Sequence, residues 1–184
     1  MSEKNQILNR RSIRLKEYDY SQAGAYFVTI CAHHRECLFG KIVEGKMHLR
    51  KAGMVLQGIW EKLPQRYPET GIDVAMIMPN HFHGIITIDA GAIHESPLRM
   101  PTSTPSRRKM LLSKMVGYFK MNSAKQINRL RGTPGAPVWQ RNYYEHVIRN
   151  EMDLEETREY IQNNPLKWLE DENHPDHIRR RGDS

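Results

Sequence analysis

Apolar residues recur along the chain with two different spacings, and each spacing predicts a different kind of element. Short runs of β-branched and aromatic residues bounded by turn formers predict strands, and such runs occupy 25–32, 73–78, 82–88 and 144–148, with a shorter strand pair near 41–49. Apolar residues three or four positions apart predict helices over 51–67 and 107–131. A last helix should begin after Asn150, a good N-cap residue, and end near Asn163 because Pro165 follows.

This order of elements predicts an α+β fold in which an antiparallel sheet carries its helices on one face. The 184 residues suffice for one domain with its own core. We divide the chain into a basic lead-in arm (1–20), one folded domain (21–170) and a polar, basic tail (171–184). No run approaches the ~18 apolar residues of a membrane span, and the N-terminus lacks an apolar signal core. We therefore expect a cytoplasmic protein that does not bind a membrane.

The formal net charge of +7 favours a polyanionic partner, above all nucleic acid. The segment 107–131 contains eight Lys and Arg residues and no acidic residue, and such a segment repels itself unless an anion binds it. A solvated basic surface is the plainer interpretation. The candidate DNA-binding residues are Arg10, Arg11, Arg14, Arg107, Arg108, Lys109, Lys114 and Arg141.

Two histidines, His81 and His83, flank Phe82 in the strand that follows Pro79-Asn80. Alternate residues of a strand point to the same face, so the two imidazoles should lie side by side while Phe82 faces the other way. Imidazoles at this spacing can share one divalent cation. A pair of hydrogen-bonded histidines without a metal is the alternative.

Tyr160 and Asn164 are four residues apart and therefore neighbours on one face of the last helix. A phenol can attack phosphorus, and an amide oxygen can bind a hard cation. A half-buried tyrosine with an asparagine that closes the helix is the alternative. Because Asn164 precedes Pro165, we expect its backbone to leave the α region.

The segment 138–146 combines an aromatic, a cationic and an imidazole side chain before and within a strand. Trp139 could stack on a base, although a large aromatic after a proline-rich turn is more often part of a core. Arg141 could hold a phosphate. Glu145 and His146 could orient a site or form surface contacts.

Taken in order, these motifs resemble those of the REP-associated tyrosine transposases, which belong with the single-tyrosine transposases of insertion sequences in the HUH endonuclease superfamily. The resemblance covers residues 20–170. It rests on the segments 79–83, 139–140, 144–146, 160–161 and 164–165.

The resemblance implies a ferredoxin-like fold with the HUH pair on a central strand and the tyrosine helix beside it. It implies that Tyr160 is the nucleophile, and that His81, His83 and Asn164 are ligands for Mg²⁺ or Mn²⁺. Many relatives carry Gln at the third ligand position, so Asn164 departs from them towards the REP-associated group. Tyr118, Tyr143 and Tyr144 are competitors for the nucleophile, but an Asn-Pro pair does not follow them.

The implied activity is cleavage and rejoining of single-stranded or hairpin DNA, such as repetitive palindromic elements, through a 5′-phosphotyrosine, by a monomer or a homodimer. Two other functions remain open. A non-catalytic nucleic-acid-binding module would need exposed strand aromatics, for which Tyr26 and Phe27 are candidates. A metal-dependent hydrolase would use the His pair with water as the nucleophile. A domesticated transposase that cuts its sites without moving them is a third variant.

Overall fold

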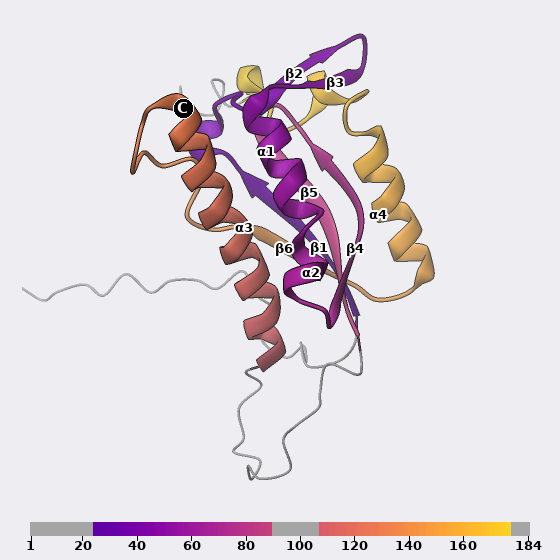
Figure 1. The fold of residues 1–184 in the computed structure, drawn as a ribbon. Helices are drawn as coiled ribbons and strands as arrows, with labels where there is room; N and C mark the ends of the chain where they lie inside the picture. Colours follow the sequence, from indigo (N-terminus) through magenta and orange to yellow (C-terminus); the bar gives the residue numbers. More distant parts are fainter. Residues whose placement is uncertain (1–23, 90–106, 178–184) are drawn as a thin grey trace, which may run out of the picture.

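A single four-stranded antiparallel sheet organises the chain (Figure 1). The computed structural model describes residues 24–89 and 107–177. Its sheet strands are β1 (Gly24–Cys31), β4 (Thr70–Ile77), β5 (His81–Ile88) and β6 (Tyr144–Ile148), in the order β4-β5-β1-β6. The helices are α1 (Lys51–Trp60), α2 (Leu63–Arg66), α3 (Arg107–Arg131) and α4 (Glu151–Asn163), and a separate hairpin joins β2 (Gly40–Val43) to β3 (Lys46–Leu49).

The connections between these strands produce a ferredoxin-like topology. β5 pairs with both β1 and β4, and β1 also pairs with β6, in each case antiparallel. Two β-α-β units therefore interlock, with α1 and α2 in the first crossover and α3 in the second. The expected α+β class, with an antiparallel sheet and the HUH motif on a central strand, is confirmed.

The helices divide between the two faces of the sheet. α1 and α3 pack against each other and cover one face of the sheet, in agreement with the prediction that helices cover one face. α4 packs instead against the opposite face, where Ile161 joins Phe27, Ile85 and Ile148 in a smaller apolar cluster. Ile85 lies two residues after His83 on the same strand, so its side chain points to the same face as His81 and His83. Helix α4 therefore covers the face to which the two histidines point.

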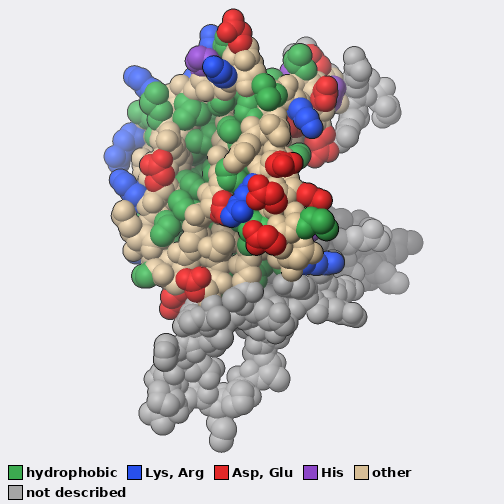
Figure 2. Space-filling model, turned by 90° about the vertical axis from the view of Figure 1, so that its right-hand side faces the viewer, with side chains coloured by type: hydrophobic (Ala, Val, Ile, Leu, Met, Phe, Trp, Pro, Cys, Tyr) green, Lys and Arg blue, Asp and Glu red, His purple; other side chains and the backbone are tan. Residues whose placement is uncertain are grey.

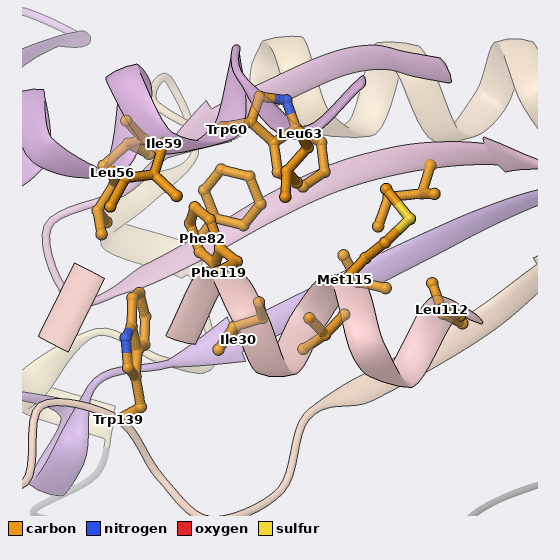
Figure 3. Close-up of a cluster of buried hydrophobic side chains, with 14 of the residues drawn as sticks. Ile30, Leu56, Ile59, Trp60, Leu63, Phe82, Leu112, Met115, Phe119 and Trp139 are labelled. Atoms are coloured by element: carbon orange, nitrogen blue, oxygen red, sulfur yellow. The ribbon is translucent and has the colours of Figure 1, made fainter. Parts of the chain in front are cut away.

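The main core lies between the sheet and the pair α1 and α3 (Figure 3). Phe82 and Phe119 pack in a tilted arrangement at a ring separation of 4.9 Å, and Trp60 packs on Phe82 at 4.7 Å. Gly84 provides the room, because a Cβ at that position would lie 2.7 Å from the Trp60 ring. The side chain between the two histidines is therefore fixed in the core, which restrains the strand that carries the imidazoles.

Two local expectations were wrong. The helix predicted over 51–67 is two helices, because Pro64 has no N–H to donate and falls at the start of α2. Asn164 keeps α-helical angles (φ −57°, ψ −40°) in spite of Pro165. The chain continues in turns after α4, with the N–H of Leu166 and that of Lys167 donating to the carbonyl of Asn163. Tyr160 and Asn164 consequently remain one helical turn apart on one face.

Within residues 24–89 and 107–177, no helix is long and apolar enough to cross a membrane.

Candidate functional site

The two imidazoles of the His-x-His motif face each other beneath α4. The Nε2 atoms of His81 and His83 are 2.8 Å apart, and both side chains are almost fully buried. Burial lowers the pKa of His81 to about 3, and burial, with His81 adding to it, lowers the pKa of His83 well below its usual value. Both rings are therefore neutral at physiological pH and can offer lone pairs to a cation.

Asn80 determines which nitrogen of His81 carries the proton. Its Nδ2 donates to the carbonyl oxygens of Asn173 (2.7 Å) and Arg35 (3.0 Å), which orients the amide. Its Oδ1 therefore accepts the hydrogen bond of His81 Nδ1 at 2.9 Å. The neutral His81 ring thus has its proton on Nδ1 and a lone pair on Nε2, which can accept from His83 Nε2 at 2.8 Å or bind a cation, as a metal ligand needs.

Thr29 supports the second imidazole. Its Oγ1 lies 2.9 Å from His83 Nδ1, and a hydroxyl can either donate or accept in that contact. When the Thr29 hydroxyl accepts, His83 carries its proton on Nδ1 and its Nε2 is free. The ring of Phe27 stacks on His83 at 5.4 Å and limits its rotation.

The chain after α4 returns to this pair, and the motifs in the sequence did not predict this return. Asp171, expected to belong to a polar tail, has its Oδ2 at 3.7 Å from His81 Nε2, with a nearly buried side chain. His81, His83 and Asp171 form a group whose ligand atoms all lie within 4.8 Å of one another. The only signal in the sequence is a polar run after Trp168, and no spacing rule connects that run with the histidines.

Tyr160 approaches the same pair from α4. Its ring meets His83 edge-on at 5.4 Å and Phe27 at 5.9 Å, and its side chain is half exposed. Burial raises the pKa of Tyr160, and Asp171 adds to the rise, while the Asn164 amide opposes it. The phenol is therefore protonated at neutral pH and needs help to act as a nucleophile.

Asn164 is buried next to Tyr160, and its Oδ1 has no hydrogen-bond partner among the described residues. Such an oxygen carries a desolvation penalty unless a donor or a cation meets it. It lines a cleft together with Tyr160 and Asp171.

Polar contacts at the start of α4 and within it hold the helix that carries Tyr160. Asn150 caps its N-terminus by accepting from the N–H of Asp153 at 2.8 Å, and the Asp153 carboxylate meets His146 of β6 at 3.1 Å. Nearer Tyr160, Arg158 donates to the Asp73 carboxylate of β4, with a shortest contact of 2.6 Å. His146 therefore helps to position α4, and nothing places it at the histidine pair.

A second cleft, of about 470 Å³, opens on the other side of Tyr160. It is lined by side chains from β1, β5, β6 and α4, from the loop before β6, and from the segments that follow β1 and α4: Phe27, Thr29, Cys31, Arg35, His83, Gln140, Asn142, Tyr143, Tyr144, Tyr160, Glu172 and Asn173. Lys120 of α3 fixes that loop, since its Nζ donates to the carbonyls of Gln140 (2.7 Å) and Arg141 (2.9 Å). Lys120 is thus a structural cation, although it belongs to the basic segment.

Trp139 belongs to the core. It is 8% exposed, its Nε1–H donates to Ser123 Oγ at 2.9 Å, and its ring packs on Phe39 at 4.9 Å. The stacking role considered for Trp139 therefore has no support, because its ring cannot reach a base.

Three of the candidate DNA-binding residues, Arg10, Arg11 and Arg14, lie outside the described residues. Three more begin α3, and their side chains also lie outside the described part: Arg107, Arg108 and Lys109. Lys114 lies on the exposed side of α3, and Arg141 is exposed in the loop before β6. Most of the predicted DNA-binding surface therefore stays a prediction.

Acidic side chains gather near the middle of the face that carries α4, with basic side chains among them and along the edges (Figure 2). The exposed acidic residues of that helix are Glu151, Glu155, Glu156 and Glu159. This face would repel a phosphate backbone, whereas the cleft beyond Tyr160 contains one cation, Arg35, one acidic residue, Glu172, and several uncharged amides.

Comparison with known proteins adds independent evidence. A protein of Haemophilus influenzae whose function is uncharacterised is 41% identical over 170 residues, which cover 90% of this chain and 93% of that protein. A second protein of the same bacterium, assigned as a REP-associated tyrosine transposase, is 28% identical over 153 residues, or 81% of this chain and 74% of that protein. The chain is thus similar to REP-associated tyrosine transposases, the family that its motifs resemble.

This similarity supports a transposase function and an enzymatic role. Two solved structures also show similarity. A REP-associated tyrosine transposase bound to a REP hairpin matches with a TM-score of 0.47 and 23% identity, over 79% of this chain and 68% of that one. A protein of Deinococcus radiodurans assigned as a transposase matches with a TM-score of 0.45 and 14% identity, over 82% and 97%. No family model matches the sequence.

Proposed function

We propose that this transposase is a metal-dependent single-strand DNA endonuclease and strand transferase that works through a covalent bond to Tyr160. The observation that carries the proposal is the contact between the Tyr160 ring and His83, which brings a phenol to a buried pair of neutral imidazoles. Tyr160 is half exposed at the boundary of two clefts, so a phosphate can reach it.

The side chains fit a divalent cation. His81 presents a free lone pair because Asn80 holds its proton on the other nitrogen, and Asn164 contributes an oxygen that no described group satisfies. His81, His83 and Asn164 would hold Mg²⁺ or Mn²⁺, hard enough for oxygen and able to accept imidazole. A bound ion would polarise the scissile phosphate as a Lewis acid.

Tyr160 Oη attacks the scissile phosphorus. The bond from phosphorus to the 3′ oxygen breaks, so the 5′ phosphate becomes esterified to Tyr160 and the other fragment leaves. The phenol gives up its proton to solvent, and the departing 3′ oxygen takes up a proton to become a hydroxyl. The 3′-OH of another strand can then attack the phosphotyrosine, which frees Tyr160 and joins the strands without a nucleotide cofactor.

The charge distribution favours entry of the DNA on the side of the loop before β6. That cleft has Arg35 and a single acidic residue, Glu172, whereas the other has five acidic residues and one lysine. A single strand or the flank of a hairpin fits better than a duplex, because Tyr160 must reach an exposed phosphate. The association of the family with REP elements, which are palindromic, favours hairpin DNA as the substrate. Because the proposed substrate is DNA, we expect the protein to act in the cytoplasm.

Tyr160→Phe tests the proposal, and Tyr144→Phe is its matched control. Both side chains are 50% exposed, and both contact Phe27. With Mn²⁺ and a panel of labelled hairpins that carry single-stranded flanks, the wild type and Tyr144→Phe should form a covalent adduct on denaturing gels. Tyr160→Phe should bind the same DNA and form none. An adduct that survives in Tyr160→Phe and disappears in Tyr144→Phe would refute the assignment.

The same assay separates the other functions. Metal-dependent cutting without any adduct, retained in Tyr160→Phe, would indicate a hydrolase that uses water. Binding without cutting would indicate a non-catalytic module. The structure supports the second alternative poorly, because Tyr26 and Phe27 are buried and form no stacking surface.

A further inference from the structure

Asp171 Oδ2 and His81 Nε2 face each other in the buried site. The Asn80 amide holds the proton of neutral His81 on Nδ1, so its Nε2 presents a lone pair to Asp171 Oδ2 at 3.7 Å. A hydrogen bond requires a donor, and neither atom is one. Two buried electron-rich atoms in this position repel each other unless a cation lies between them.

Asp171 is held in this position by its own segment. The N–H of Asn173 donates to Asp171 Oδ1 at 2.6 Å, which leaves Oδ2 to face the histidine. Asn173 is in turn bound to the rest of the site: its carbonyl accepts from Asn80, and its Oδ1 accepts from Arg35. The carboxylate is therefore oriented before any ligand binds.

We propose that Asp171 is a ligand of the same ion as His81 and His83, and that the ion thereby fastens the chain after α4 to strand β5. The proposal rests on the metal site of the proposed function and adds to it a residue outside the HUH and tyrosine motifs. Two ligands at right angles on an ion with ~2.1 Å bonds are ~3.0 Å apart. The Nε2 atoms of His81 and His83 are 2.8 Å apart, and His81 Nε2 lies 3.7 Å from Asp171 Oδ2. These distances lie on either side of ~3.0 Å, so small rotations of the side chains would let all three atoms bind one ion.

The carboxylate also changes what the site can bind. Two imidazoles and an amide form an uncharged set, whereas Asp171 adds a negative charge that offsets part of the charge of a divalent ion. Two histidines and one carboxylate on one side of an ion leave the opposite positions open. Such an ion would have coordination positions to offer to a phosphate oxygen of DNA bound at Tyr160.

Titration of Mn²⁺ into the metal-free full-length protein, followed by calorimetry, tests the assignment. Asp171→Ala should weaken the affinity at least ~10–100-fold, the loss typical even of groups that only support a ligand. Asp171→Asn, which keeps an acceptor for the Asn173 N–H, should weaken it less but measurably. Asp176→Asn removes the same charge from an exposed position of the same segment and should change nothing.

Amide hydrogen exchange supplies a second readout that does not depend on activity. In the wild type, Mn²⁺ should slow exchange in the segment 168–177, and in Asp171→Ala it should not. An Asp171→Ala affinity within threefold of the wild type overturns the proposal. So does wild-type affinity in Asp171→Asn with loss only in Asp171→Ala, since that pattern means a local folding effect.

These outcomes are separate from failure of the proposed function. If Tyr160→Phe keeps the covalent adduct while Asp171→Ala loses the ion, the nucleophile is wrong and the metal ligand is right. If the wild type binds no Mn²⁺, both the metal site and the role of Asp171 are overturned.

Discussion

Asn80→Ala should damage stability and metal binding together, because one buried amide serves three partners. Its Oδ1 accepts from His81 Nδ1, and its Nδ2 donates to the carbonyls of Arg35 and Asn173. The side chain is fully buried, so water cannot easily replace these hydrogen bonds. The variant leaves one imidazole N–H and two carbonyls without a partner.

The size of the effect follows from these hydrogen bonds. A buried polar group left unpaired costs about 1–3 kcal/mol. The bond to the Arg35 carbonyl is only partly buried, so solvent can compensate for its loss. The other two are fully buried, and we expect a decrease of about 2–5 kcal/mol in the free energy of unfolding. Loss of the tautomer constraint on His81 should also weaken Mn²⁺ binding roughly 10–100-fold.

Urea unfolding and calorimetric Mn²⁺ titration measure the two effects. Asn122→Ala is the control, since Asn122 makes one part-buried bond to the Tyr118 carbonyl within α3. It should lower the stability by less than about 1 kcal/mol, because alanine is the better helix former. A decrease below about 1 kcal/mol for Asn80→Ala, or unchanged Mn²⁺ affinity, would refute the role that we assign to this amide.

Three shorter predictions concern the helix α4, the core and the basic segment. The hydrogen bonds from Arg158 hold the pKa of Asp73 below its usual value. The stability that they contribute is therefore fully present above the unfolded pKa of ~3.9 and is lost as the pH falls through the lower, folded pKa. Arg158→Gln should consequently lower the urea midpoint at pH 7 much more than at pH 3. Trp139→Phe should lose the bond to Ser123 and destabilise the fold by about 1–2 kcal/mol, and a tenfold loss of hairpin affinity instead would mean that Trp139 stacks on a base. The three basic residues that begin α3 are Arg107, Arg108 and Lys109. Neutralising them should reduce the slope of log affinity for hairpin DNA against log salt concentration by ~1 for each DNA phosphate that they contact in the wild type. An unchanged slope would mean that the DNA binds elsewhere.

Local patterns predicted the parts of the site that depend on one element. The period of a strand places His81 and His83 on one face, and the structure brings their Nε2 atoms within 2.8 Å. The capping preference of asparagine predicted the start of α4 at Asn150, which accepts from the Asp153 N–H. In both cases the interacting residues are close in sequence, so the backbone geometry alone determines that they meet.

Contacts between distant residues could not be predicted in this way. Asn80 and Asn173 are 93 positions apart, and their bond depends on how the chain turns after α4. Asn164 shows the difficulty at one residue: the proline rule favoured an extended backbone, yet the turns that follow keep it helical. The steric preference of a residue before proline for an extended backbone is worth little free energy. Burial of Asn164 and the hydrogen-bonded turns that follow it outweigh this preference.

The two halves of the proposed site are held with different strength, and this difference bears on catalysis. The histidines lie on a central strand whose intervening side chain is locked in the main core. Tyr160 lies on a helix outside the ferredoxin-like core, which contributes few apolar side chains to the sheet and depends on polar contacts such as Arg158 with Asp73. Elements with few buried apolar contacts open at the lowest free energy. Under the proposed function, movement of α4 would carry Tyr160 and Asn164 away from His81 and His83, which stay on β5, and such a movement would help an enzyme that must exchange one strand for another.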